Sequence, residues 1–192
     1  MPWRRLVVPL VFMITLTAAC GDPPDKEIQQ ARAAIDAAAS AGAERYAADE
    51  LSAARDALKR STDAVDQRDY RLALNHALDA RERAQNATQQ ARTREVAART
   101  DAERALGASA VALQTARARL KSAETARVPV RALNGARRSF ATAEESVQKA
   151  RASFAQANYP AAAETARAAT SDLQGVVRDL DAAMPAATRR RH

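Results

Sequence analysis

Alanine is the feature that most constrains how this chain can fold, because it supplies 51 of the 192 residues. It has the highest helix propensity of all residues, and the residues that accompany it, chiefly arginine, glutamate, glutamine and leucine, are strong helix formers too. Alternating apolar and polar residues, the pattern of half-buried strands, are missing from residues 26–184. The sequence therefore predicts an all-α protein.

The larger apolar residues recur with the three-and-four spacing of an amphipathic helix, and alanines fill many of the positions between them. Only 27 apolar residues larger than alanine follow Cys20, which excludes a thick globular core. We expect an elongated bundle of antiparallel helical hairpins with Ala/Leu heptad seams. The expected seam residues are Leu51, Ala54, Leu58, Ser61 and Val65; Leu106, Ala110, Leu113, Ala116, Leu120 and Ala123; Leu133, Ala136, Phe140, Ala143, Val147, Ala150, Phe154 and Ala157; and Ala162, Ala166, Ala169, Leu173, Val176, Leu180 and Ala183.

Glycine and proline mark the expected breaks between helices, near Gly42 and near Pro129. Pro160 suits the first turn of a final helix. Gly107 is the position at which the longest helix could kink. The expected helices cover residues 26–41, 47–66, 70–126, 130–157 and 160–183.

The chain contains a repeat of about half its length. Asp69-Tyr70 and the alanines that follow match Asn158-Tyr159 and its alanines at an offset of 89 residues, whereas Leu51 matches Leu133 at an offset of 82. The difference of seven residues is one heptad, the insertion that keeps an apolar stripe in register. We expect a first helical hairpin unit over residues 26–100 and a second over residues 101–184.

The first 19 residues have the three parts of a signal peptide. Arg4 and Arg5 form a positive region, Leu6–Leu16 an apolar run, and Thr17-Ala18-Ala19 the small residues that a signal peptidase needs. The run is 11 residues long, too short to cross a hydrocarbon core of roughly 30 Å as a helix. The stretch Leu16-Thr17-Ala18-Ala19-Cys20 resembles a bacterial lipobox, the motif in which the cysteine is lipidated.

Cys20 is the only cysteine, so it is the expected lipid attachment site and no disulfide can form within the chain. The alternative is a plain secretory signal, which would remove Cys20 or leave it as a free thiol. In known lipoproteins the absence of aspartate directly after the cysteine favours the outer membrane. Because Gly21 stands there, we expect the periplasmic face of that membrane, with residues 20–25 as lipidated cysteine and tether.

The formal net charge of +7 invites a nucleic-acid hypothesis, but it is concentrated at the two ends. Two charges belong to the signal peptide and three to Arg189, Arg190 and Arg191, which leaves 25 basic and 23 acidic residues between them. The body carries no basic surface of the kind that nucleic acids bind. We expect residues 185–192 to be a basic, disordered tail that either keeps the chain soluble or contacts the cell wall, anionic head groups or lipopolysaccharide.

Residues Ala31 to Ala91 resemble a family of alanine-rich bacterial envelope lipoproteins classed as a domain of unknown function. The residues that carry the resemblance are Ala41-Gly42-Ala43-Glu44-Arg45-Tyr46-Ala47, Glu50-Leu51, Ala54, Leu58, Asp69-Tyr70, Ala73 and Ala77. Some members carry an OmpA-like peptidoglycan-binding domain after the helices, and we expect none in this chain. The resemblance implies a location in the envelope and a helical fold rather than an activity.

No residue pattern indicates catalysis, a cofactor or a metal. His76, with Asp79 three residues later, is the one histidine of the helical body, and two such residues do not make a metal site. Tyr46, Tyr70 and Tyr159 each fall at an expected helix break. Each ring either plugs the end of a hairpin, with its hydroxyl reaching water or backbone, or contacts a partner such as a peptide or glycan.

The sequence thus predicts a non-enzymatic, lipid-anchored periplasmic protein that acts as a scaffold or binding module in the cell envelope. Its partners are the membrane, through the anchor, and another protein or a second copy, through the helical seams. Two alternatives remain open: an oligomeric, rod-like spacer between outer membrane and wall, and a periplasmic chaperone or carrier of an apolar ligand.

Overall fold

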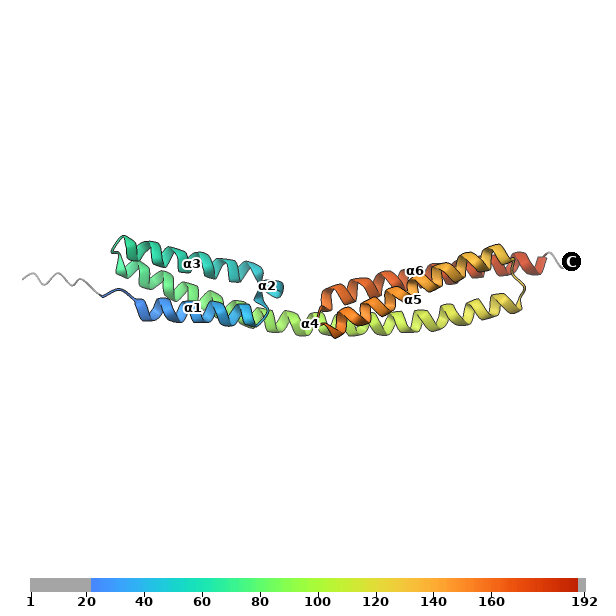
Figure 1. Cartoon of the computed structure of the whole chain (residues 1–192), viewed down its shortest axis with the longest axis horizontal. Helices are drawn as coiled ribbons and strands as arrows, with labels where there is room; N and C mark the ends of the chain where they lie inside the picture. Colours follow the sequence, from blue (N-terminus) through green and yellow to red (C-terminus); the bar gives the residue numbers. More distant parts are fainter. Residues whose placement is uncertain (1–21, 190–192) are drawn as a thin grey trace, which may run out of the picture.

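The computed structural model describes residues 22–189, with side chains described as far as residue 184. Its regular elements are all α-helices packed against one another, which confirms the predicted fold class. The helices are α1 (Asp25–Ser40), α2 (Ala43–Tyr46), α3 (Ala48–Asp66), α4 (Tyr70–Thr125), α5 (Val130–Ala155) and α6 (Tyr159–Arg189). They form an elongated molecule, and α4 runs along most of it as one helix of 56 residues (Figure 1). At 1.5 Å per residue, α4 is about 84 Å long.

Two helical units, each with three longer helices, lie end to end on α4 (Figure 1). The N-terminal unit consists of α1, α2, α3 and residues 70–91 of α4, and the C-terminal unit consists of residues 102–125 of α4 with α5 and α6. Among the described helices, none of one unit other than α4 packs against a helix of the other. Residues 92–101 of α4, called the waist below, connect the two units.

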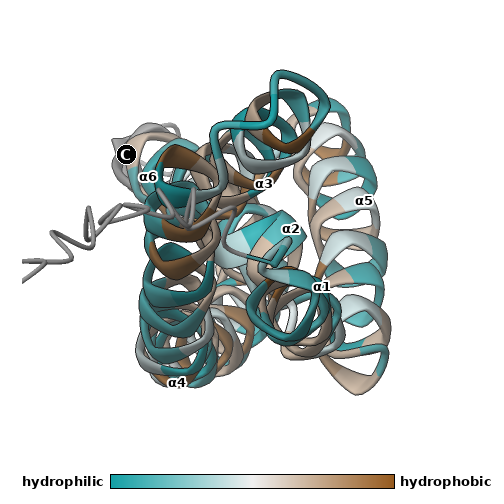
Figure 2. Ribbon diagram, turned by 90° about the vertical axis from the view of Figure 1, so that its left-hand side faces the viewer, coloured by the Kyte–Doolittle hydropathy of each residue, from teal (hydrophilic) through white to brown (hydrophobic). Residues whose placement is uncertain are grey.

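Each helix is amphipathic rather than apolar around its whole circumference (Figure 2). In the N-terminal unit the inward face of α4 is built of alanine alone, and these alanines have no exposed surface: Ala73, Ala77, Ala80, Ala84, Ala87 and Ala91. The matching inward residues of α6 lie 89 positions later: Ala162, Ala166, Ala169, Leu173, Val176 and Leu180. The C-terminal unit therefore has the larger apolar core.

The predicted seams are correct along α5 and α6 but shifted in part of α3 and of α4. In the second half of α4 the buried residues include Ala102, Ala105 and Ser109, whereas Leu106 and Leu113 are only half-buried. In α3, likewise, alanines occupy the closest approach and the larger Leu58 and Val65 pack beside it. Alanine takes these positions because its small side chain lets the helices come together, a preference that a search for large apolar residues misses.

The repeat is visible in the helix lengths, since α3 has 19 residues and α5 has 26. The seven-residue difference predicted from the sequence therefore lies within α5, the counterpart of α3 in the second unit. By the same comparison, the second half of α4 corresponds to α1, because α1 ends at Ser40 and α4 ends 85 residues later at Thr125. Helix α4 is thus the last helix of one unit and the first of the next.

The same backbone turn ends α3, α4 and α5. In each, a non-glycine residue adopts a positive φ, namely Arg68 (61°), Arg127 (54°) and Ala157 (56°). The next residue donates its N–H to the carbonyl five residues earlier, at 2.9, 3.2 and 2.9 Å respectively. This Schellman arrangement satisfies the last carbonyls of each helix and reverses the chain. At the start of α4, Asp69 caps the helix by accepting a hydrogen bond from the backbone N–H of Leu72 at 3.0 Å.

Two sequence-based boundaries are wrong. The expected break after residue 41 contains an additional short helix, α2, which begins after Gly42 in the left-handed conformation (φ 81°). Helix α6 continues through Pro185 to Arg189, so a disordered tail does not begin at residue 185. Met184 packs against the apolar end of the C-terminal unit and favours this continuation. Residues 190–192 lie outside the described part.

Two glycine-to-alanine substitutions should change stability in opposite directions. A methyl group at Gly107, inside α4, would meet no atom within 4 Å. Gly107→Ala should therefore raise the free energy of unfolding by about 0.5–1 kcal/mol through helix propensity. Gly42→Ala should lower it by about 1 kcal/mol, because its φ of 81° strains a residue with a Cβ. Urea denaturation followed by circular dichroism measures both, and two shifts of the same sign would contradict this account.

Candidate functional site

The structure brings together two of the three tyrosines proposed as partner contacts. Tyr46 ends α2 and Tyr159 begins α6, and both lie beside the waist, whereas Tyr70 begins α4 at the far end of the N-terminal unit (Figure 1). From Tyr70 to Arg94 along α4 is about 36 Å at 1.5 Å per residue. The three rings cannot contribute to one compact site. The proposed lipid attachment residue, Cys20, lies outside the described residues.

Two arginine hydrogen bonds fix the corner formed by α2 at the waist. Arg94 of α4 donates from Nη1 to the carbonyl oxygen of Tyr46 at 2.8 Å. Arg45 donates from Nη1 to the carbonyl oxygen of Ala157, in the turn before α6, at 3.2 Å. The second bond joins the two units directly, so the waist is braced by a contact in addition to the helix itself.

The environments of the two waist tyrosines differ. Tyr159 stacks at a tilt on Phe154, with ring centroids 5.2 Å apart, as expected for a ring that closes the end of a hairpin. The Tyr46 ring packs on the core of the N-terminal unit, but its hydroxyl is buried and has no hydrogen-bond partner among the described residues. The expected hydrogen bond from this hydroxyl to the backbone is therefore not formed by the described residues.

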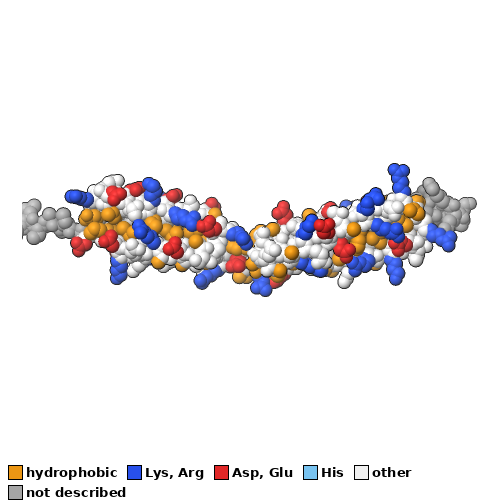
Figure 3. Space-filling model, viewed as in Figure 1, with side chains coloured by type: hydrophobic (Ala, Val, Ile, Leu, Met, Phe, Trp, Pro, Cys, Tyr) orange, Lys and Arg blue, Asp and Glu red, His pale blue; other side chains and the backbone are white. Residues whose placement is uncertain are grey.

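Charges around the waist are exposed and mixed. The pKa of Arg99 is raised above its usual value, chiefly because its guanidinium donates a hydrogen bond to Glu103 at 3.0 Å and is attracted by that carboxylate. An open hollow of about 540 Å³ lies beside the α2 corner, bordered by Arg45, Arg92, Glu44 and Glu95 among others. Both signs are interspersed along the whole face of the molecule seen in Figure 3, so this face presents no single-sign patch.

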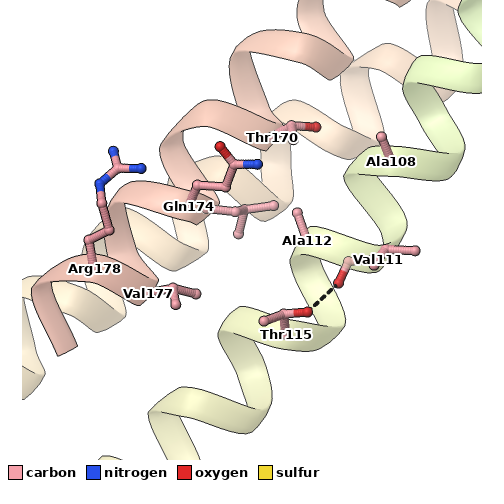
Figure 4. Close-up of a pocket in the computed structure, with 9 residues that line it drawn as sticks. Ala108, Val111, Ala112, Thr115, Thr170, Gln174, Val177 and Arg178 are labelled. Carbon is pink, nitrogen blue, oxygen red and sulfur yellow. Dashed lines mark hydrogen bonds between the residues drawn. The ribbon is translucent and has the colours of Figure 1, made fainter. Parts of the chain in front are cut away.

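An apolar groove between α4 and α6 is the feature that the sequence analysis missed. It has a volume of about 560 Å³, and its residues are Ala108, Val111, Ala112 and Thr115 of α4 with Thr170, Leu173, Gln174, Val177 and Arg178 of α6 (Figure 4). Val111 is 64% exposed although it is apolar. A comparison of equivalent positions in the two repeats could have revealed this groove. Val111 and Val177 of the second repeat stand where the first repeat has the polar residues Lys26 and Thr88.

Ion pairs between the two helices lie beyond both ends of this groove. At one end Arg167 of α6 binds both carboxylate oxygens of Asp101. At the other end Arg119 of α4 lies 2.9 Å from Asp181 of α6. The groove therefore occupies a defined stretch of the α4–α6 surface.

Within the described part of the chain, no three histidine, cysteine, aspartate or glutamate side chains gather as a metal site would require. Asp79 forms ion pairs with Arg60 and Arg83. None of the helices described here combines the length and apolar character needed to cross a membrane.

These features define a class of protein: an elongated, all-α chain in which two helical units share one continuous helix. The model of a family described as Domain of unknown function (DUF4398) matches residues 26–105. The match confirms the resemblance of this part of the chain to a domain of unknown function. The matched region covers the N-terminal unit and the waist. The chain matches no curated protein and no solved structure.

Proposed function

We propose that this protein is a lipid-anchored, non-enzymatic scaffold of the bacterial cell envelope, held at the periplasmic face of the outer membrane through Cys20. The signal-peptide pattern and the lipobox-like residues before Cys20 support the anchor. The mixed surface charge and the extended helical surfaces support a binding role.

The observation that carries the scaffold proposal is the position of the two ends of the described chain. Helix α1 begins at one end of the molecule and α6 ends at the other (Figure 1). An anchor at Cys20, five residues before α1, would therefore attach one end of a rod whose central helix is about 84 Å long. Such a protein can hold the C-terminal unit well away from the membrane.

A rod-like spacer that oligomerises is the second candidate, and the same length favours it. The two candidates differ in oligomeric state, because a spacer that associates through its seams would form a stable trimer or larger assembly. Sedimentation of the purified chain separates them: a monomer supports the scaffold with its own binding surface, and a stable trimer supports the spacer.

Replacing Cys20 with serine tests the anchor. We expect Cys20→Ser to abolish lipid attachment, because serine lacks the thiolate that takes the lipid in thioether linkage. Partition into detergent and the mass of the mature N-terminus should both report the loss. Thr17→Leu, which keeps the cysteine, serves as the control and should remain lipidated. A wild-type protein that matures without lipid would rule out the anchor.

A further inference from the structure

The internal repeat provides a direct comparison for the apolar groove. The groove residues Val111, Ala112 and Thr115 of α4 correspond to residues of α1 85 positions earlier, and each groove residue of α6 corresponds to a residue of α4 89 positions earlier. Five pairs replace a polar residue of the N-terminal unit by a less polar one: Lys26 by Val111, Glu27 by Ala112, Gln30 by Thr115, Arg81 by Thr170 and Thr88 by Val177.

In the N-terminal unit, polar side chains bridge the equivalent surface. Arg81 donates from Nη1 to Oε1 of Gln30 at 2.7 Å, which joins α4 to α1. In the C-terminal unit both positions are threonine, and Thr115 and Thr170 each bond to their own helix, to the carbonyls of Val111 and Ala166. The same helix arrangement thus forms with polar residues at these positions, so folding alone does not require an apolar surface there.

We propose that this groove binds one amphipathic α-helix of a partner protein, with an apolar face flanked by carboxylates. The groove extends over residues 108–115 of α4, about 10 Å, which matches two turns of a docked helix. Its residues on α4, Ala108, Val111, Ala112 and Thr115, follow the i, i+3, i+4 and i+7 spacing by which helices pack side by side. Docking would cover Val111 and Val177, between which the surface is open (Figure 4).

The charges around the groove favour an acidic partner. Arg178 lines the groove, and no carboxylate does. Arg104 and Arg119 extend the α4 stripe by one turn at either end, each exposed beside a single carboxylate, Asp101 at 3.8 Å and Asp181 at 2.9 Å respectively. With Arg167, the groove and its ends contain four arginines and two aspartates, so carboxylates on the incoming helix would find complementary charge.

The same charges disfavour a second copy of this chain. In a two-fold dimer with the α4 stripes antiparallel, Arg104 of one copy would lie beside Arg119 of the other. Like charges brought together in this way oppose association. A partner helix with acidic ends avoids this repulsion.

A synthetic helical peptide tests the proposal with the purified full chain. The probe has about 16 residues, with leucines at i, i+3, i+4 and i+7 and glutamates at both ends, so that it presents two to three apolar turns. We expect binding with a dissociation constant of about 10–100 μM by fluorescence anisotropy.

Val111→Ser should weaken binding about tenfold, because it removes the most exposed apolar contact. Arg178→Ala, or lysines in place of the peptide's glutamates, should weaken it about fivefold or more.

Val96→Ser is the matched control, because Val96 is 66% exposed on the same helix but lies at the waist, outside the groove. Circular dichroism should show unchanged helix content in both valine variants. Failure of the peptide to bind up to about 1 mM, or equal affinity of the two valine variants, would overturn the proposal. Self-association that is lost in Val111→Ser would also overturn it, in favour of a second copy. The groove proposal rests on the proposed scaffold function, because a scaffold needs a binding partner. Peptide binding in the groove does not depend on lipidation of Cys20, so the groove proposal and the anchor proposal can fail independently.

Discussion

Replacing Val96 with proline is expected to uncouple the two helical units. Val96 lies in the middle of the waist and is 66% exposed, so the substitution removes almost no side-chain packing. Proline lacks the N–H that a residue inside a helix donates, and its ring collides with the carbonyl of the preceding turn. The cost to helix α4 is about 3 kcal/mol. Because only the four-residue helix α2 and the first turn of α6 lie beside the waist, and no long helix runs along it (Figure 1), the break should become a hinge.

Two measurements follow the effect of Val96→Pro. Spin labels at exposed positions 56 on α3 and 148 on α5, in a Cys20→Ser background, should give one narrow distance distribution in the parent and a broad one in the proline variant. Thermal unfolding should change from one transition to two, with the alanine-seamed N-terminal unit melting first. Val96→Ala is the control and should retain the narrow distribution. A narrow distribution in Val96→Pro would mean that the Arg45 contact, rather than α4, holds the units in place.

Leu173→Ala should be the most destabilising single truncation in the C-terminal core. Leu173 has no exposed surface and packs with Val147 and alanines of all three helices in the middle of this unit. Truncation of a fully buried leucine costs about 2–5 kcal/mol, through lost burial and the cavity that remains. For a domain with a typical stability of about 5–15 kcal/mol this is a large fraction.

The repeat supplies the reciprocal experiment. Ala84 occupies the position equivalent to Leu173 in the N-terminal unit and is equally buried. Ala84→Leu should destabilise that unit by about 1–3 kcal/mol, because the added side chain must force α1 and α3 away from α4. Ala97→Leu, at an exposed position of the waist, is the control and should change stability little. Denaturant titration measures all three variants, and a stabilising Ala84→Leu would show that the alanine seam is loosely packed.

The helical fold was predictable because it depends on local properties of the chain. Alanine content and three-and-four spacing predict the long helices, and the Asp69-Tyr70 and Asn158-Tyr159 repeats predict two similar turns. The short helix α2 was missed because a glycine reads as a break, whereas Gly42 both ends one helix and begins the next. The shift of the seams in α3 and α4 was missed because the closest helix contacts select the smallest residues.

The candidate sites were less predictable, because they depend on which surfaces the packing leaves open. The sequence singled out three tyrosines, but it could not show that Tyr46 and Tyr159 share the waist while Tyr70 lies at the far end. The apolar groove arises from residues about 60 positions apart on α4 and α6, each unremarkable on its own helix. Only the paired helices bring Val111 and Val177 onto one surface.

Two helical units are held apart on one continuous helix, which gives the protein the length that the proposed scaffold role requires. Small-angle scattering of the purified chain tests it most directly. A rod built on a helix of about 84 Å should have a radius of gyration of about 25 Å. A value near 16 Å, expected for a compact chain of this size, would show that the units fold back on each other and would contradict the account.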